Sequence, residues 1–76
     1  MSTLNFHHLR YFYEVARAGA LTRAAAALRV SPSALSVQIQ QIEAQLGVTL
    51  FERRGRQLVL TEAGRIALDH AQTIFD

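Results

Sequence analysis

The sequence contains no cysteine, no tryptophan and no lysine, and it has only one proline and four glycines in 76 residues. The absence of cysteine excludes disulfides, thiolate zinc sites and cysteine nucleophiles. No apolar run approaches the roughly 18 residues of a membrane-spanning helix. The residues after Met1 lack the basic and apolar segments of a secretory signal. The length permits one small domain, which we expect to be cytoplasmic.

Arginine supplies all eight basic side chains, against six acidic ones, so the formal net charge is +2. Three of the arginines crowd into residues 53–56. A guanidinium group offers forked donors that suit phosphate and the guanine edge. Because a net charge of +2 alone is only weak support for a nucleic-acid partner, the placement of the arginines matters more than their number.

Apolar residues recur at helical spacing in three segments of the first 47 residues. Asn5 is a plausible N-cap for the first helix, and Gly19 stands where a helix end needs a left-handed residue. Ser31 and Pro32 form the clearest start signal, because serine caps free amides and proline suits the first helical position. Gly47 ends that third helix. The apolar positions are Phe6, Leu9, Phe12, Tyr13 and Ala16, then Leu21, Ala24, Ala25 and Leu28, then Leu35, Ile39, Ile42 and Leu46.

The period changes after Gly47. Two short runs, Val48–Phe51 and Gln57–Leu60, flank a segment that holds Arg53, Arg54 and Arg56, which predicts a β-hairpin with a basic tip. Thr61 then caps a fourth helix. Only three residues separate the second and third helices, the length of the turn in a helix-turn-helix. We therefore predict a mainly α fold: a winged helix-turn-helix, with a three-helix core and a β-hairpin wing, followed by a fourth helix.

The third helix has an uncharged outward face. At 100° per residue, Ser33, Val37, Gln40 and Ala44 fall opposite the apolar seam, and Glu43 lies to the side. Short hydroxyl, amide and apolar groups suit close approach to base edges and phosphates, whereas a carboxylate there would repel the DNA backbone. An ordinary solvated helix face is the alternative, but such faces usually carry lysine and glutamate.

With these motifs in order, the sequence resembles the N-terminal DNA-binding domain of LysR-type transcriptional regulators. The resemblance spans essentially the whole chain with the family's spacing, which makes it specific. It implies a winged helix-turn-helix domain at 1–61 and the start of a linker, or dimerisation, helix at 62–76, which we expect to be truncated. The matching segments are Leu9–Phe12, Gly19–Ala25, Leu28–Ser36, Gln38–Ile39, Ile42–Glu43, Leu46–Gly47, Leu50–Arg53 and Leu60–Gly64.

The resemblance also implies roles for individual residues. The third helix would enter the major groove of double-stranded DNA, and the wing would reach the minor groove or its phosphates. The recognition positions are Ser31, Pro32, Ser33, Ser36, Val37 and Gln40, with Thr22, Arg23, Arg53 and Arg54 at the DNA backbone and the wing. Arg56 belongs to the same basic tip. The fourth helix would pair two subunits of a homodimer, with Ile66, Leu68, Ala71, Ile74 and Phe75 as the candidate contacts.

The sequence departs from the family pattern at positions that would read bases. Many members carry Gln-Pro where this chain has Pro32 and Ser33, and a polar residue where it has Val37, so the base preference does not carry over. Ala20 stands where serine is frequent, which assigns the cap of the second helix to Thr22. The resemblance further implies a C-terminal effector-binding domain, of which these 76 residues contain no part, so we expect this stretch by itself to bind DNA without a small-molecule effector.

Other functions find less support in the residues. The histidines His7, His8 and His70 lack acidic partners at ligand spacing, so we predict no metal site and no cofactor. Asp69 and His70 are adjacent and point apart, so no catalytic triad forms with Ser36, and we predict no enzyme. The aromatic residues lie at core spacing rather than on a stacking platform. The alternative that stays open is a small helical protein–protein interaction module with the same architecture.

Overall fold

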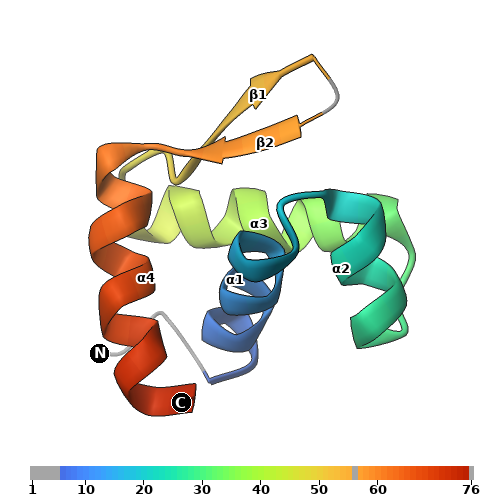
Figure 1. Ribbon diagram of the computed structural model, residues 1–76, viewed down its shortest axis with the longest axis horizontal. Helices are drawn as coiled ribbons and strands as arrows, with labels where there is room; N and C mark the ends of the chain where they lie inside the picture. Colours follow the sequence, from blue (N-terminus) through green and yellow to red (C-terminus); the bar gives the residue numbers. More distant parts are fainter. Residues whose placement is uncertain (1–5, 56, 76) are drawn as a thin grey trace.

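The computed structural model describes residues 6–55 and 57–75. Three helices come first, then a hairpin, then a fourth helix (Figure 1), so the predicted winged helix-turn-helix is confirmed. Helix α1 lies in front of α3 in Figure 1, between α4 and α2, and packs against all three. The elements are α1 (Phe6–Ala18), α2 (Leu21–Leu28), α3 (Pro32–Leu46), β1 (Phe51–Arg54), β2 (Gln57–Leu60) and α4 (Glu62–Phe75).

The boundaries of α3 follow the local start and stop signals. The Ser31 side chain accepts a hydrogen bond from the Ala34 amide at 3.1 Å, and Pro32 occupies the first turn. Gly47 adopts a left-handed backbone with φ of 72°, where its missing Cβ avoids strain, and its amide donates to the Glu43 carbonyl. These two predictions are confirmed. The predicted Asn5 cap lies outside the described residues.

The turn between α2 and α3 is closed by an arginine in a left-handed conformation. Arg29 has a φ of 62°, and the amide of Val30 donates to the Ala25 carbonyl at 3.0 Å. At the other end of α2, the prediction that Thr22 is the cap is wrong. Ala20 occupies the cap position with extended backbone and offers no side-chain acceptor, so Thr22 lies inside the first turn.

The hairpin differs from its prediction in the bounds of its first strand. The expected strand Val48–Phe51 contributes only its last residue, and β1 continues to Arg54, which pairs with Gln57. The antiparallel register places Phe51 opposite Leu60 and Arg53 opposite Leu58. The pairing extends this far because Gly55, with a φ of 61°, lets the chain reverse directly after Arg54. Arg53 and Arg54 therefore lie on the strand rather than in a loop.

One hydrophobic core joins the helices to the base of the hairpin. The Phe12 and Phe51 rings lie 5.5 Å apart and connect α1 to β1. Of the predicted α3 seam, Leu46 is 44% exposed, because the helix ends there and its side chain extends past the core. The buried apolar residues are Phe12, Tyr13, Val15, Ala24, Ala25, Leu35, Ile39, Ile42, Leu50, Phe51 and Ala71.

Helix α4 starts against the segment that links α3 to the wing. As predicted, Thr61 caps α4: its side-chain oxygen accepts from the Gly64 amide at 3.0 Å and its hydroxyl donates to the Thr49 carbonyl. A Cβ on Gly64 would overlap the carbonyl oxygen of Leu50. The far end of α4 packs on α1, where the Phe75 ring lies 4.9 Å from that of Tyr13. Both ends of α4 are therefore fixed to the core.

Candidate nucleic-acid interface

The predicted recognition positions form a largely exposed strip along α3. Ser33, Val37 and Gln40 are exposed, and Ser36 is half-buried. Ser31 and Pro32 are exposed at the start of the helix, where the two hydroxyl oxygens of Ser31 and Ser33 lie 3.4 Å apart. Because none of these side chains is charged, the strip offers hydrogen-bonding and apolar groups without repelling phosphate.

A first groove opens between the start of α2 and the wing. It has a volume of about 390 Å³, and Thr22 lines it on the α2 side. Arg53, Gly55 and Leu58 line it on the wing side. Because Ala20 supplies no side-chain cap, the first-turn amides of α2 retain the positive end of the helix dipole beside this groove. Thr22 and the exposed Arg23 thus stand next to a position that suits an anion.

A second, smaller groove of about 120 Å³ lies between α3 and the wing. Ser36 and Gln40 line its α3 side, and Arg53 and Leu58 line its wing side. Among the predicted site residues that the structure describes, Arg53 alone borders both grooves. The guanidinium-bearing side chain of the wing is therefore next to the amide and hydroxyl groups of α3, although the residues are 13 or more positions apart in sequence.

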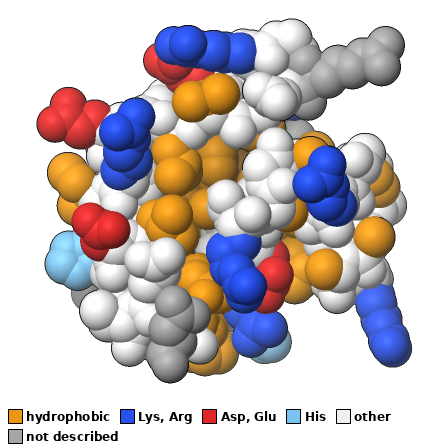
Figure 2. Space-filling model, viewed as in Figure 1, with side chains coloured by type: hydrophobic (Ala, Val, Ile, Leu, Met, Phe, Trp, Pro, Cys, Tyr) orange, Lys and Arg blue, Asp and Glu red, His pale blue; other side chains and the backbone are white. Residues whose placement is uncertain are grey.

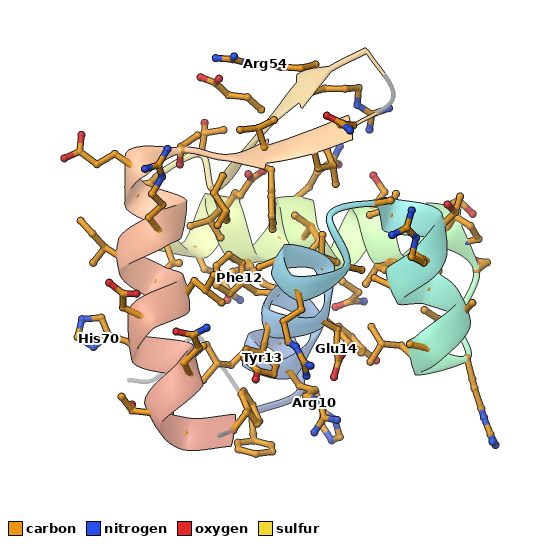
Figure 3. The ribbon with its side chains drawn as sticks, viewed as in Figure 1. Arg10, Phe12, Tyr13, Glu14, Arg54 and His70 are labelled. Atoms are coloured by element: carbon orange, nitrogen blue, oxygen red, sulfur yellow. The ribbon has the colours of Figure 1, made fainter. Side chains whose placement is uncertain are left out.

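The two described wing arginines face opposite sides of the hairpin. Successive strand residues alternate, so Arg53 shares a face with the buried Phe51, and Arg54 shares the other with Glu52. Arg54 is 3.4 Å from the Glu52 carboxylate, in an exposed ion pair. Figure 3 labels Arg54 at the outer edge of the hairpin, and Figure 2 shows basic and acidic groups side by side there. Arg56, the third predicted wing residue, lies outside the described residues.

Glu43 lines the groove and contacts the wing, which its position in the sequence did not predict. Its carboxylate accepts hydrogen bonds from the Leu50 amide at 2.8 Å and the Phe51 amide at 3.3 Å. A signal for this was present: a carboxylate in the last turns of a helix is unfavourable beside the negative end of the helix dipole, so it requires a partner elsewhere.

The candidate dimer residues divide between two faces of α4. Ile66 and Ile74 are each 55% exposed, and they are eight residues apart on one side of the helix. His70, midway between them, is labelled in Figure 3 on the side of α4 away from the other helices. Ala71 is 0% exposed in this chain's own core, so its prediction as a dimer contact is wrong. Leu68 and Phe75 are partly buried against that core.

No group of three or more histidine, aspartate and glutamate side chains among the described residues could hold a metal ion. No described helix is both long and apolar enough to cross a membrane.

Comparison with known proteins gives the fold a family. Residues 6–65 match the family model described as bacterial regulatory helix-turn-helix protein, lysR family. The chain is 45% identical, over 71 residues, to the RuBisCO operon transcriptional regulator of Allochromatium vinosum. That match covers 93% of this chain but only 24% of the relative, so the chain spans about a quarter of that regulator's length.

Two similar solved structures contain DNA. The chain superimposes on the crystal structure of the CbnR DNA-binding domain in complex with DNA with a TM-score of 0.88 at 43% identity. That match covers 95% of this chain and 83% of the other. For the BenM DNA-binding domain in complex with catB site 1 DNA, the TM-score is 0.89, the identity 35%, and the coverage 95% and 81%. The chain therefore belongs to the LysR family of bacterial helix-turn-helix regulators and comprises the family's DNA-binding domain.

Proposed function

We propose that this chain binds double-stranded DNA sequence-specifically, with α3 in the major groove and the wing at the adjacent minor groove or its phosphates. The observation that carries the proposal is the groove in which Arg53 of the wing meets Ser36 and Gln40 of α3. In this groove, side chains suited to base edges lie beside a side chain suited to phosphate, so both are able to contact the same DNA duplex. The DNA complexes of CbnR and BenM, whose domains have the same fold, support this reading.

The side chains of α3 would discriminate between bases. The exposed Gln40 carries an amide that is able to make a bidentate contact with adenine, and Val37, at 49% exposed, offers an apolar surface to a thymine methyl. Ser33 and Ser36 donate or accept, so they tolerate several base edges. Ser31 and Pro32 lie at the start of the helix, whose N-terminal end would face a phosphate.

The arginines and the start of α2 would hold the DNA backbone. Thr22 and Arg23 stand beside the uncapped amides of α2, and Arg53 reaches the same groove from the wing. Arg54 forms an ion pair with Glu52, so its contribution to DNA affinity is smaller than that of Arg53. Arg56 belongs to the same basic wing and adds to the attraction for phosphate.

We further propose that the outer face of α4, defined by Ile66, His70 and Ile74, pairs with the same face of a second copy. Two large aliphatic side chains, each 55% exposed and aligned on one helix, favour an apolar partner over water. A pair of recognition helices would then address two related half-sites. The regulator containing this domain would act on DNA in the bacterial cytoplasm.

A selection followed by a salt titration tests the proposal. Duplexes chosen by the chain from a randomised pool should share a motif, and their affinity should fall steeply with salt, because bound arginines displace counterions. Gln40→Ala should alter the preferred base at one position by roughly 1–3 kcal/mol, with other positions unchanged. Binding that is undetectable, or that ignores salt, would instead favour the protein–protein interaction module.

A further inference from the structure

Glu43 makes four hydrogen bonds to the short segment that connects α3 to the wing. Its backbone carbonyl accepts from the amides of Gly47 at 2.8 Å and Val48 at 3.2 Å. Its side-chain carboxylate accepts from the amides of Leu50 and Phe51. A single residue of the recognition helix thus holds the chain from the end of that helix to the first residue of β1.

Without the hydrogen bonds from Leu50 and Phe51, the position of the Glu43 carboxylate would be electrostatically unfavourable. It lies in the last turns of α3, beside the negative end of the helix dipole. It also lines the groove beside Gln40 and Arg53, where it would repel an approaching phosphate. Its two backbone donors offset this cost, and one of them belongs to Leu50, which is buried. Without the carboxylate, that buried amide would lose its partner.

The contact continues into the DNA-facing part of the wing. Phe51 is anchored on one side by Glu43 and on the other by its ring contact with Phe12. Arg53 follows two residues later on the same face of β1. A paired strand transmits a displacement of Phe51 to Arg53 with little loss, because the ladder hydrogen bonds hold its shape. The hydrogen bond that the Phe51 amide donates to Glu43 is therefore at the first residue of the strand that carries Arg53.

We propose that Glu43 is a positioning residue for DNA binding: its carboxylate sets the place of the wing against α3 and thereby directs Arg53 to the DNA that α3 reads. The inference rests on the proposed function, because it requires that Arg53 contact DNA. Glu43 itself makes no contact with DNA in this arrangement. Its effect on affinity passes entirely through the wing.

Two substitutions separate the geometry of Glu43 from its charge. Glu43→Gln removes the charge but leaves an acceptor oxygen at the same distance from the backbone. Glu43→Asp retains the charge but shortens the side chain by one methylene, which withdraws the carboxylate from the amides of Leu50 and Phe51. Glu43→Ala removes both. Thermal melting and far-UV circular dichroism verify that each variant is folded, and the glutamine–aspartate pair decides the question if the alanine variant is not.

The experiment is a double-mutant cycle between Glu43 and Arg53, measured with a duplex that the unmodified chain selects from a random pool. Arg53→Ala should weaken binding about tenfold in the unmodified chain. In the Glu43→Asp and Glu43→Ala backgrounds the same change should have a several-fold smaller effect, since coupled residues show interaction energies of this order. In the Glu43→Gln background the tenfold effect should persist.

A matched control removes one negative charge elsewhere. Glu14 is on α1, paired with Arg10 at 2.9 Å, and Figure 3 labels it on the side of the molecule away from Arg54 and the wing. Glu14→Gln should leave the effect of Arg53→Ala unchanged. It distinguishes a general change of net charge from loss of the Glu43 contact.

Three outcomes would overturn the inference. If Glu43→Ala and Glu43→Asp bind as tightly as the unmodified chain or more tightly, the carboxylate acts only by repelling phosphate. If they bind more weakly but Arg53→Ala retains its full effect, Glu43 supports the fold without directing the wing. If Arg53→Ala has no effect in any background, the wing contact in the proposed function fails, and the role of Glu43 fails with it.

Discussion

Helices α3 and α4 are nearly equal in length, 15 and 14 residues, and both bury one face in the same core, yet their exposed faces differ in chemistry. The exposed side of α3 carries serine and glutamine with one large aliphatic residue inside the helix, Val37, and a second, Leu46, where the helix ends. The exposed side of α4 carries Ile66 and Ile74 with His70 between them. One face suits hydrated base edges, and the other suits an apolar protein surface.

The surroundings of the two helices strengthen that difference. Grooves border α3 and the start of α2, and Arg53 of the wing lies in both of them. Neither Ile66 nor Ile74 is among the residues that line those two grooves. By their burial patterns alone, α3 and α4 are similar amphipathic helices. The chemistry of the exposed face, together with its neighbours, supports the proposal that α3 meets DNA and that α4 meets a second copy.

The largest expected effect comes from a substitution that destabilises the whole fold and so disrupts the exposed faces of both α3 and α4. Gly64→Ala would place a Cβ on the Leu50 carbonyl and the Leu60 side chain, where backbone leaves no room. We expect a loss of about 3 kcal/mol or more of unfolding free energy, measured by thermal and denaturant melts. Gly47→Ala is the control, because its Cβ would meet open space and only the left-handed backbone would resist, at about 1 kcal/mol. Equal effects of the two changes would contradict the tight approach of α4.

A substitution on the exposed face of α4 should have an intermediate effect, and it should change the oligomeric state alone. Ile74→Glu removes an apolar contact of about 2 kcal/mol and adds a charge to the proposed interface, so sedimentation should shift toward the monomer. The melting temperature should change little, since the side chain is exposed. Gln72→Glu adds the same charge at an exposed position outside the stripe Ile66, His70 and Ile74 and should leave the oligomeric state unaltered. An unchanged oligomer in Ile74→Glu would place the interface elsewhere.

The smallest effect compares the two sides of the wing. Arg53→Ala should weaken all duplexes about tenfold, or by about 1.4 kcal/mol, and lower the slope of affinity against salt by about one unit, as expected for one lost phosphate contact. Arg54→Ala should have less effect, because Glu52 already neutralises that guanidinium and the pair is exposed. A stronger loss from Arg54 than from Arg53 would reverse the assigned orientation of the hairpin.

The sequence predicted the ends of its helices better than it predicted their inner faces. Ser31, Gly47 and Thr61 act within one turn of their own position, by a cap or a permitted φ, so local chemistry identifies them. Ala71 and Leu46 were misassigned because both belong to apolar patterns wide enough to face either way. Which residue of such a pattern is buried depends on the partner helix and on where the helix stops.

The candidate site shows the same division. The uncharged strip on α3 and the basic wing were predictable, because residue type and helical spacing are properties of the sequence alone. The contrast between Arg53 and Arg54 was not, because it follows from the strand bounds, and short apolar runs leave those ambiguous. Glu43 was noticed only as a lateral carboxylate, since its partners Leu50 and Phe51 follow the turn that reverses the chain.

The order of the elements, both ends of α3, the start of α4 and the kind of side chain on each outer face follow from the sequence alone. Caps, turn glycines and periodicity act over a few residues and need no tertiary context. The tertiary structure decided which wing arginine faces α3, which residues of α4 are exposed, and that Glu43 joins α3 to the wing. These depend on contacts between segments distant in sequence, whose energies come from burial and pairing that no local pattern encodes.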